Sequence, residues 1–188
     1  MENNYTSKDN ILDTYYIIND CANSNIGIQA LSGLIGFPVA LAIDATIVFT
    51  HYAPMINNIR RLYCLEPFSK DYLVGVIKNI SSEILFDFMF DKLAGQIPVM
   101  GIYFNAICAK AFTWRLGILF AILSRTNESS EENIKNIARL IRNMFPQKDI
   151  FKFTKPDYQI FKKILLSAED TEFLFKDRVA DALKAFEI

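Results

Sequence analysis

Residues 97–124 read IPVMGIYFNAICAKAFTWRLGILFAILS, and only two of these side chains, Lys110 and Arg115, are charged. A proline in the first turn of a helix has its φ angle preset and sacrifices no hydrogen bond, so Pro98 is a suitable start. The stretch therefore predicts one long helix from Pro98 to Ser124. A helix this apolar must be buried, either in a protein core or in a membrane.

A second apolar stretch, residues 33–49, reads GLIGFPVALAIDATIVF and has Asp44 as its only charge. Its part FPVALAIDATIVF matches IPVMGIYFNAICA at three positions, with a constant offset of 60 residues. The match indicates two similar helix starts rather than a clear duplication. It predicts a second proline-led helix, Pro38–Leu65, which Pro54 bends or interrupts.

Much of the remaining chain has the three- and four-residue spacing of apolar side chains that is typical of one-sided helices. This spacing predicts helices over Asp71–Leu93, Glu131–Phe145, Pro156–Leu166 and Thr171–Phe186, with Pro156 near a first helical turn and Thr171 as an N-cap. No Asn-Gly or Asp-Gly turn separates alternating residues, so no hairpin is predicted. The predicted fold class is all-α, a multi-helix bundle in which the two proline-led helices are central and pack on Asp71–Leu93.

Composition divides the chain near residue 126. Residues 1–126 carry 9 Lys or Arg and 10 Asp or Glu, whereas residues 127–188 carry 11 of each in half the length. The polar run Ser124–Asn133 links the two parts. The sequence thus predicts an apolar helical core over residues 1–126 and a charged amphipathic helical tail, packed on that core, over residues 127–188.

No arrangement of catalytic or ligand-binding residues stands out. Phosphate-binding glycine loops are missing, and the single histidine, His51, lies in an apolar segment where a core histidine is commoner than a catalytic base. Glu83, Asp87 and Asp91 share one helix face, which suits solvent more often than a divalent cation or a basic partner. The net charge of −1 gives no field that attracts nucleic acid. We expect a non-enzymatic protein with no cofactor, no metal and no nucleic-acid partner.

Residues 26–49 and 97–123 each reach the length of a membrane span, so the sequence allows either a cytoplasmic or a membrane location. In residues 26–49, twelve Leu, Ile, Val or Phe contribute about −5 kcal/mol to insertion, while Asp44 opposes it by up to roughly 3 kcal/mol. In residues 97–123, Lys110 and Arg115 oppose insertion by roughly 2.5–3.5 kcal/mol each. The sequence favours a cytoplasmic or peripherally attached core over a hairpin in the inner membrane. An odd number of cysteines without a signal peptide also suits the cytoplasm: Cys21, Cys64 and Cys108.

The charges inside the apolar stretches form the candidate site of the sequence. An isolated buried charge is costly, so Asp44, Lys110 and Arg115 must each be paired, hydrogen-bonded or neutral. If the two proline-led helices pack together, Asp44 can pair with one of the two cations. We expect such a pair to fix helix register, with a switch as the alternative use. Breaking it on one side would cost about 3–5 kcal/mol.

The charged tail supplies a candidate partner surface. Its apolar stripes are too narrow to be stable alone, so its helices must lie on the body, on each other or on another protein. Large aromatic side chains often anchor interfaces, although core packing is their commoner use. The candidate anchors are Phe145, Phe151, Phe153, Phe161, Phe173 and Phe175, continued by Phe186.

A scattered set of residues between positions 20 and 124 carries a family resemblance: Asp44, Met55, Ile56, RLY at Arg61–Tyr63, IPVMG at 97–101, and Thr113 and Gly117 in TWRLG. In this set the chain resembles the YcjF-like bacterial domain of unknown function, which occurs alone or behind Era-like GTPase domains. The resemblance implies a helical architecture, membrane association and a GTPase connection, with no established activity.

Two functions follow as expectations. The first is a non-enzymatic helical module that associates with a membrane, with a GTPase or with another separately encoded protein, in a bacterial defence or stress system. The alternative is a soluble immunity- or adaptor-type protein that covers an apolar helix of its partner. Both make a second protein the partner, and both leave the oligomeric state open.

Overall fold

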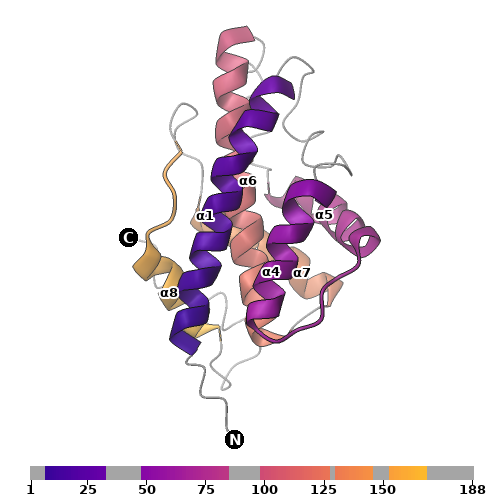
Figure 1. The fold of residues 1–188 in the computed structure, drawn as a ribbon, viewed down its shortest axis with the longest axis vertical. Coiled ribbons are helices and arrows are strands. Elements are labelled where there is room, and N and C mark those ends of the chain that lie inside the picture. The colour runs from indigo at the N-terminus through magenta and orange to yellow at the C-terminus, as the bar shows by residue number, and fades with distance from the viewer. Residues whose placement is uncertain (1–6, 33–47, 85–97, 128–129, 146–152, 169–188) are drawn as a thin grey trace, which may run out of the picture.

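The structure, a computed structural model, describes residues 7–32, 48–84, 98–127, 130–145 and 153–168. Within these ranges it contains α-helices, one π-helical segment and no strand, which confirms the predicted all-α bundle (Figure 1). The predicted helix Thr171–Phe186 lies outside the described residues.

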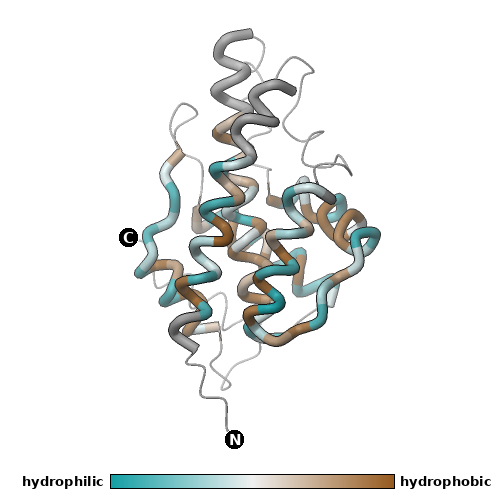
Figure 2. Tube along the Cα trace, in the orientation of Figure 1, coloured by the Kyte–Doolittle hydropathy of each residue, from teal (hydrophilic) through white to brown (hydrophobic). Residues whose placement is uncertain are grey.

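Helix α6 (Pro98–Thr126) is the centre of the bundle (Figure 1). It begins at Pro98 as predicted and ends two residues beyond the predicted Ser124. Every residue from Ala111 to Ser124 is buried. A helix that is apolar all round needs cover on all sides, and α1, α4, α7 and α8 provide it. Figure 2 shows hydrophilic residues interspersed along these outer helices.

Helix α1 (Ser7–Ser32) packs along α6 and makes the most extensive helix–helix contact of the described fold. The sequence patterns above did not predict it. Gly117 allows the two helices to approach closely, because a Cβ atom at this position would lie 2.6 Å from Cγ1 of Ile18. The buried face of α1 consists of Ile11, Thr14, Tyr15, Ile18 and Ala22.

A short π-helical segment, η2 (Val48–Tyr52), leads directly into α4 (Ala53–Leu62). Pro54 lies in the first turn of α4, and the helix is π-helical rather than α-helical just before it, as expected if Pro54 bends or interrupts the predicted helix. Proline has no N–H to donate to the carbonyl four residues earlier, and its ring crowds that carbonyl, so a regular α-helix does not continue through it. The predicted start of that helix, Pro38, lies outside the described residues.

Helices α5 (Lys70–Ile84) and α7 (Glu131–Met144) pack on each other, and α5 makes only minor contact with α6. The predicted packing of both proline-led helices on this segment is found as contacts of α5 with η2 and α6, although the main partner of α5 is α7. Helices α1 and α4 already cover α6 extensively, and the apolar stripe of α5 meets the matching stripe of α7 instead. The remainder of the predicted helix, residues 85–93, lies outside the described residues.

The last described helix, α8 (Tyr158–Ser167), packs on α1 and α6. Its N-cap is Asp157, whose carboxylate accepts a hydrogen bond from the backbone N–H of Gln159 at 2.7 Å. Pro156 directly precedes the cap, so the helix starts at Tyr158, two residues after the predicted start. The carbonyl of Pro156 accepts a hydrogen bond from the hydroxyl of Tyr15 at 2.9 Å, which ties α8 to α1.

Candidate functional site

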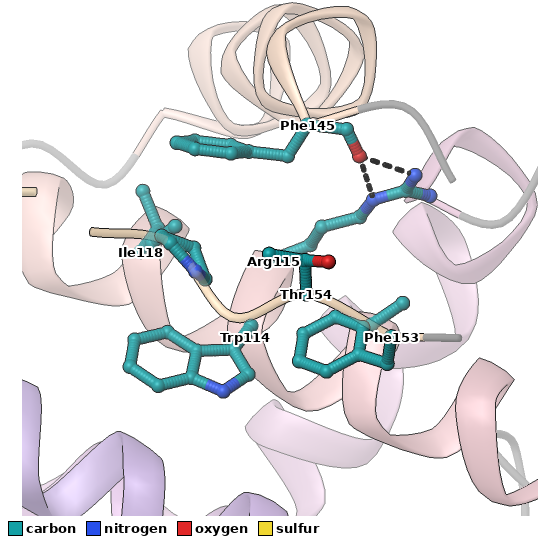
Figure 3. Close-up of a pocket in the computed structure, with 8 residues that line it drawn as sticks. Trp114, Arg115, Ile118, Phe145, Phe153 and Thr154 are labelled. Atoms are coloured by element: carbon teal, nitrogen blue, oxygen red, sulfur yellow. Dashed lines mark hydrogen bonds between the residues drawn. The ribbon is translucent and has the colours of Figure 1, made fainter. Parts of the chain in front are cut away.

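Arg115, in the middle of α6, is only 1% exposed. Its Nε and Nη2 donate hydrogen bonds to the carbonyl oxygen of Phe145 at 3.2 and 2.7 Å (Figure 3), and its Nη1 donates to the carbonyl oxygen of Ile84. Phe145 is the C-cap of α7, where carbonyl groups lack helical partners and the helix dipole is negative. Charged hydrogen bonds to two other parts of the fold thus offset the burial of the guanidinium.

These contacts bear on the predicted ion pair. The predicted burial of Arg115 is found, and the acceptors that the structure describes for it are backbone carbonyl oxygens. Lys110 is half-buried one turn earlier on α6. Asp44 lies outside the described residues, so its pairing with either cation stays a prediction.

Two arginines of α7 also donate hydrogen bonds to the end of α5. Arg139 donates hydrogen bonds from Nε and Nη2 to the carboxylate of Glu83 at 2.9 and 2.7 Å, and Arg142 donates to the carbonyl oxygen of Glu83 at 3.0 Å. Together with Arg115, these side chains hold the last two described residues of α5. We call Arg115, Arg139 and Arg142 the arginine clamp.

The clamp engages Glu83, the one described residue of the acidic face that the sequence singled out. The hydrogen bonds from Arg139 are the main reason that the pKa of Glu83 lies below its ordinary value, and partial burial opposes this effect. Asp87 and Asp91 lie outside the described residues. Among the residues that are described, no group of three His, Cys, Asp or Glu side chains is placed to hold a metal ion.

A groove of about 320 Å³ lies between α5 and α7, toward the N-terminal ends of both helices. The arginine clamp joins α5 and α7 near their C-terminal ends. Ile80 and Ile134, which are buried, belong to the groove lining, while Tyr72 remains 38% exposed. The full lining consists of Asp71, Tyr72, Gly75, Val76, Asn79, Ile80, Glu131 and Ile134.

Sequence reasoning missed this groove. Its existence depends on the relative position of two helices, and no residue pattern reports that position. One signal was available, since Gly75 interrupts an otherwise ordinary amphipathic helix.

A smaller cavity of about 60 Å³ lies beside Arg115, between α6 and residues 153–156 (Figure 3). Figure 3 shows Trp114 and Phe153 at this cavity, with the guanidinium directed at the carbonyl of Phe145. Its size suits a few water molecules rather than a cofactor. We therefore treat the larger groove as the candidate functional site.

Three of the candidate partner residues of the tail are described, and all three pack within the fold. Phe161 is fully buried and packs edge-on against Tyr15, with ring centroids 5.4 Å apart, so it is not available to a partner in this structure. Phe145 and Phe153 are half-buried and pack against the core. The remaining candidates, Phe151, Phe173, Phe175 and Phe186, lie outside the described residues.

His51 lies in η2 and is half-buried. Burial lowers its pKa from the ordinary value of 6.5 and so favours the neutral imidazole. This state suits the expected packing role.

One segment of α6, Ala106–Thr126, is long and apolar enough to cross a membrane. However, 89% of its most apolar window is buried inside the protein. Core helices of soluble proteins have the same length and composition, so this segment alone is weak support for a membrane span.

No family model, curated protein or solved structure matches this chain. The resemblance to the YcjF-like domain therefore stays a prediction, as does the GTPase connection that it implies.

Proposed function

We propose that this protein is a non-enzymatic helical binding module of the adaptor type, which receives an apolar segment of another protein in the groove between α5 and α7. The groove itself is the observation that carries the proposal. It is open, its apolar lining includes the half-buried Val76 and Tyr72, which is 38% exposed, and its volume of about 320 Å³ falls in the range of ligand pockets.

The surroundings of the groove support a binding role. Ile80 and Ile134 belong to the common hydrophobic core, so the shape of the groove is coupled to the fold. The arginine clamp fixes the relative position of the two helices at their far end. Binding surfaces built on braced helices lose less conformational entropy on association than loops do.

Photocrosslinking in the native host tests this proposal. A photoreactive amino acid would replace Tyr72 at the groove or, as a matched control, Tyr16, which is 54% exposed on α1. We expect one protein adduct that forms from position 72 and not from position 16. Equal adducts from both positions, or none from position 72, would contradict a binding role for the groove.

A second candidate function is favoured by the apolar segment Ala106–Thr126. In this proposal the module is attached peripherally or integrally at the inner membrane and works with a GTPase in a bacterial defence or stress system. A carbonate wash of host membranes separates the two proposals. Recovery in the soluble fraction supports the cytoplasmic adaptor, whereas retention in the pellet supports the membrane-associated module.

A further inference from the structure

We infer that the occupant of the α5–α7 groove is an amphipathic helix of a partner protein, which lays its apolar side over Gly75 and directs Lys or Arg side chains toward Asp71 and Glu131. This inference rests on the proposed function and specifies the chemistry of the partner.

Gly75 is a glycine at an exposed position inside helix α5. Glycine inside a helix lowers its stability relative to alanine, so its presence calls for a reason. No heavy atom of the described structure lies within 4 Å of a Cβ atom built on Gly75, so packing within those residues does not require its small size. Its φ angle also lies outside the range that favours glycine. A partner backbone that passes close to α5 does supply a reason.

The chain itself contains a precedent for this use of glycine. Gly117 on α6 lies directly against Ile18 of α1, and a Cβ atom there would meet three side-chain atoms of Ile18 at 2.6–2.8 Å. In that pair a glycine lets a neighbouring helix approach closely. Gly75 offers the same kind of contact surface on the outside of the molecule, at the groove.

The charge of the groove specifies the polar side of the occupant. The groove lining includes two carboxylates, Asp71 and Glu131, and no basic side chain among the described residues. Glu131 forms an i,i+4 ion pair with Lys135 at 3.0 Å, but its side chain is 69% exposed, so a partner cation can replace Lys135 at little cost. Basic side chains on the occupant therefore complement the groove.

The length of the groove indicates a helical occupant. Its lining on α5 extends from Asp71 to Ile80, which corresponds to roughly 14 Å of helix axis. An amphipathic helix in such a groove presents apolar anchors three and four residues apart. The partly exposed ring of Tyr72 at the rim suits contact with one of these anchors.

A displayed library of helical peptides tests the inference. Every peptide carries the same apolar stripe, and the flanking positions are randomised among acidic, basic and neutral residues. Selection uses the full-length protein, with depletion on Gly75→Trp, whose indole fills the groove. We expect Lys or Arg to be enriched at the flanks. The affinity of a selected peptide should fall at least about tenfold in Gly75→Trp and remain unchanged in Asn23→Trp, a control at an exposed position of α1.

Charge is tested separately with the double variant Asp71→Asn, Glu131→Gln. Its affinity for a basic peptide should fall severalfold and become less dependent on salt. Enrichment of acidic flanks, or unchanged binding by a Gly75→Trp protein of native circular dichroism, would overturn the inference. If the wild-type protein self-associates and Gly75→Trp abolishes this association, the occupant of the groove is a second copy of this chain, and the inference of a partner helix is overturned.

Failure of this inference can be told apart from failure of the proposed function. If the adduct formed from position 72 maps to an acidic or extended segment, the groove binds a partner but not a basic helix. If no adduct forms there, the groove has no protein occupant, and the proposed function fails as well.

Discussion

Arg115 carries a positive charge into the buried middle of α6. Its place in an apolar helix indicated that it would be buried and would need compensation. The described compensation comes from the carbonyl oxygens of Phe145 and Ile84. Main-chain acceptors have no sequence signature, because every residue carries one. The sequence could therefore predict the need for a partner but not the partner's identity.

We predict that Arg115→Met lowers the free energy of unfolding by about 3 kcal/mol, since it leaves two carbonyl groups without their charged donor. Arg115→Lys should lie between this variant and the wild type, because an ammonium group keeps the charge but lacks the planar set of donors. Urea unfolding measures both effects. Arg61→Met, at an exposed position of α4, is the control and should stay within about 0.5 kcal/mol of the wild type. A loss below about 1 kcal/mol for Arg115→Met would show that these hydrogen bonds are easily replaced.

Gly75 in α5 and Gly117 in α6 should respond oppositely to alanine. Gly117→Ala places a Cβ atom against Ile18 and should destabilise the fold by about 1–3 kcal/mol. Gly75→Ala meets nothing within 4 Å and should stabilise the protein by about 0.4–1 kcal/mol. Adding Ile18→Ala to Gly117→Ala should cost less than the sum of the two single changes, as measured by a double-mutant cycle. Effects of equal sign at both glycines would contradict the described packing.

Periodicity and capping chemistry predicted the bounds of a helix well where those bounds depend on residues of that helix alone. The predicted Glu131–Phe145 differs from α7 only at its last residue. The two starts agree because Ser130 caps the helix and accepts a hydrogen bond from the N–H of Asn133. Helix α1 was missed because its buried face mixes apolar residues with Thr14 and Ala22. The groove was missed because it depends on two helices at once.

The contact between α5 and α7 should depend on pH through Glu83. Its pKa in the folded protein lies below the ordinary 4.5, so the hydrogen-bonded carboxylate stabilises the fold above that value. This stabilisation is lost as the pH falls through the folded pKa. Glu83→Gln should therefore lower Tm by about 1–3 °C at pH 7, and this difference should vanish in acid.

Glu66→Gln, at an exposed position between α4 and α5, is the matched control and should show no such dependence. Thermal melts of both variants and the wild type between neutral and acid pH provide the measurement. If the difference in Tm between Glu83→Gln and the wild type stays constant across this pH range, the negative charge of Glu83 does not contribute to the stability of the contact.

At the scale of the whole molecule, the described helices share one hydrophobic core. Ile134 and Ile137 of α7 and Phe161 of α8 belong to the same cluster as the residues of α6. Among the described residues, the higher charge after residue 126 accompanies exposure, because Ala111–Ser124 of α6 is buried throughout while α7 and α8 each keep a solvent-facing side. Composition alone could not separate a covered core helix from a membrane span, since both are uniformly apolar.

Cysteine labelling distinguishes these two states of α6. Cys108 lies in the segment Ala106–Thr126 and is 1% exposed, whereas Cys64 is exposed. In detergent-free buffer, a water-soluble maleimide should label Cys64 rapidly and Cys108 at least about a hundredfold more slowly, because Cys108 reacts only when the fold opens. Urea should equalise the two rates, and Cys64→Ser assigns the fast phase. Native labelling of Cys108 as fast as that of Cys64 would mean that α6 separates readily from its covering helices, which is the step that insertion of this segment into a membrane requires.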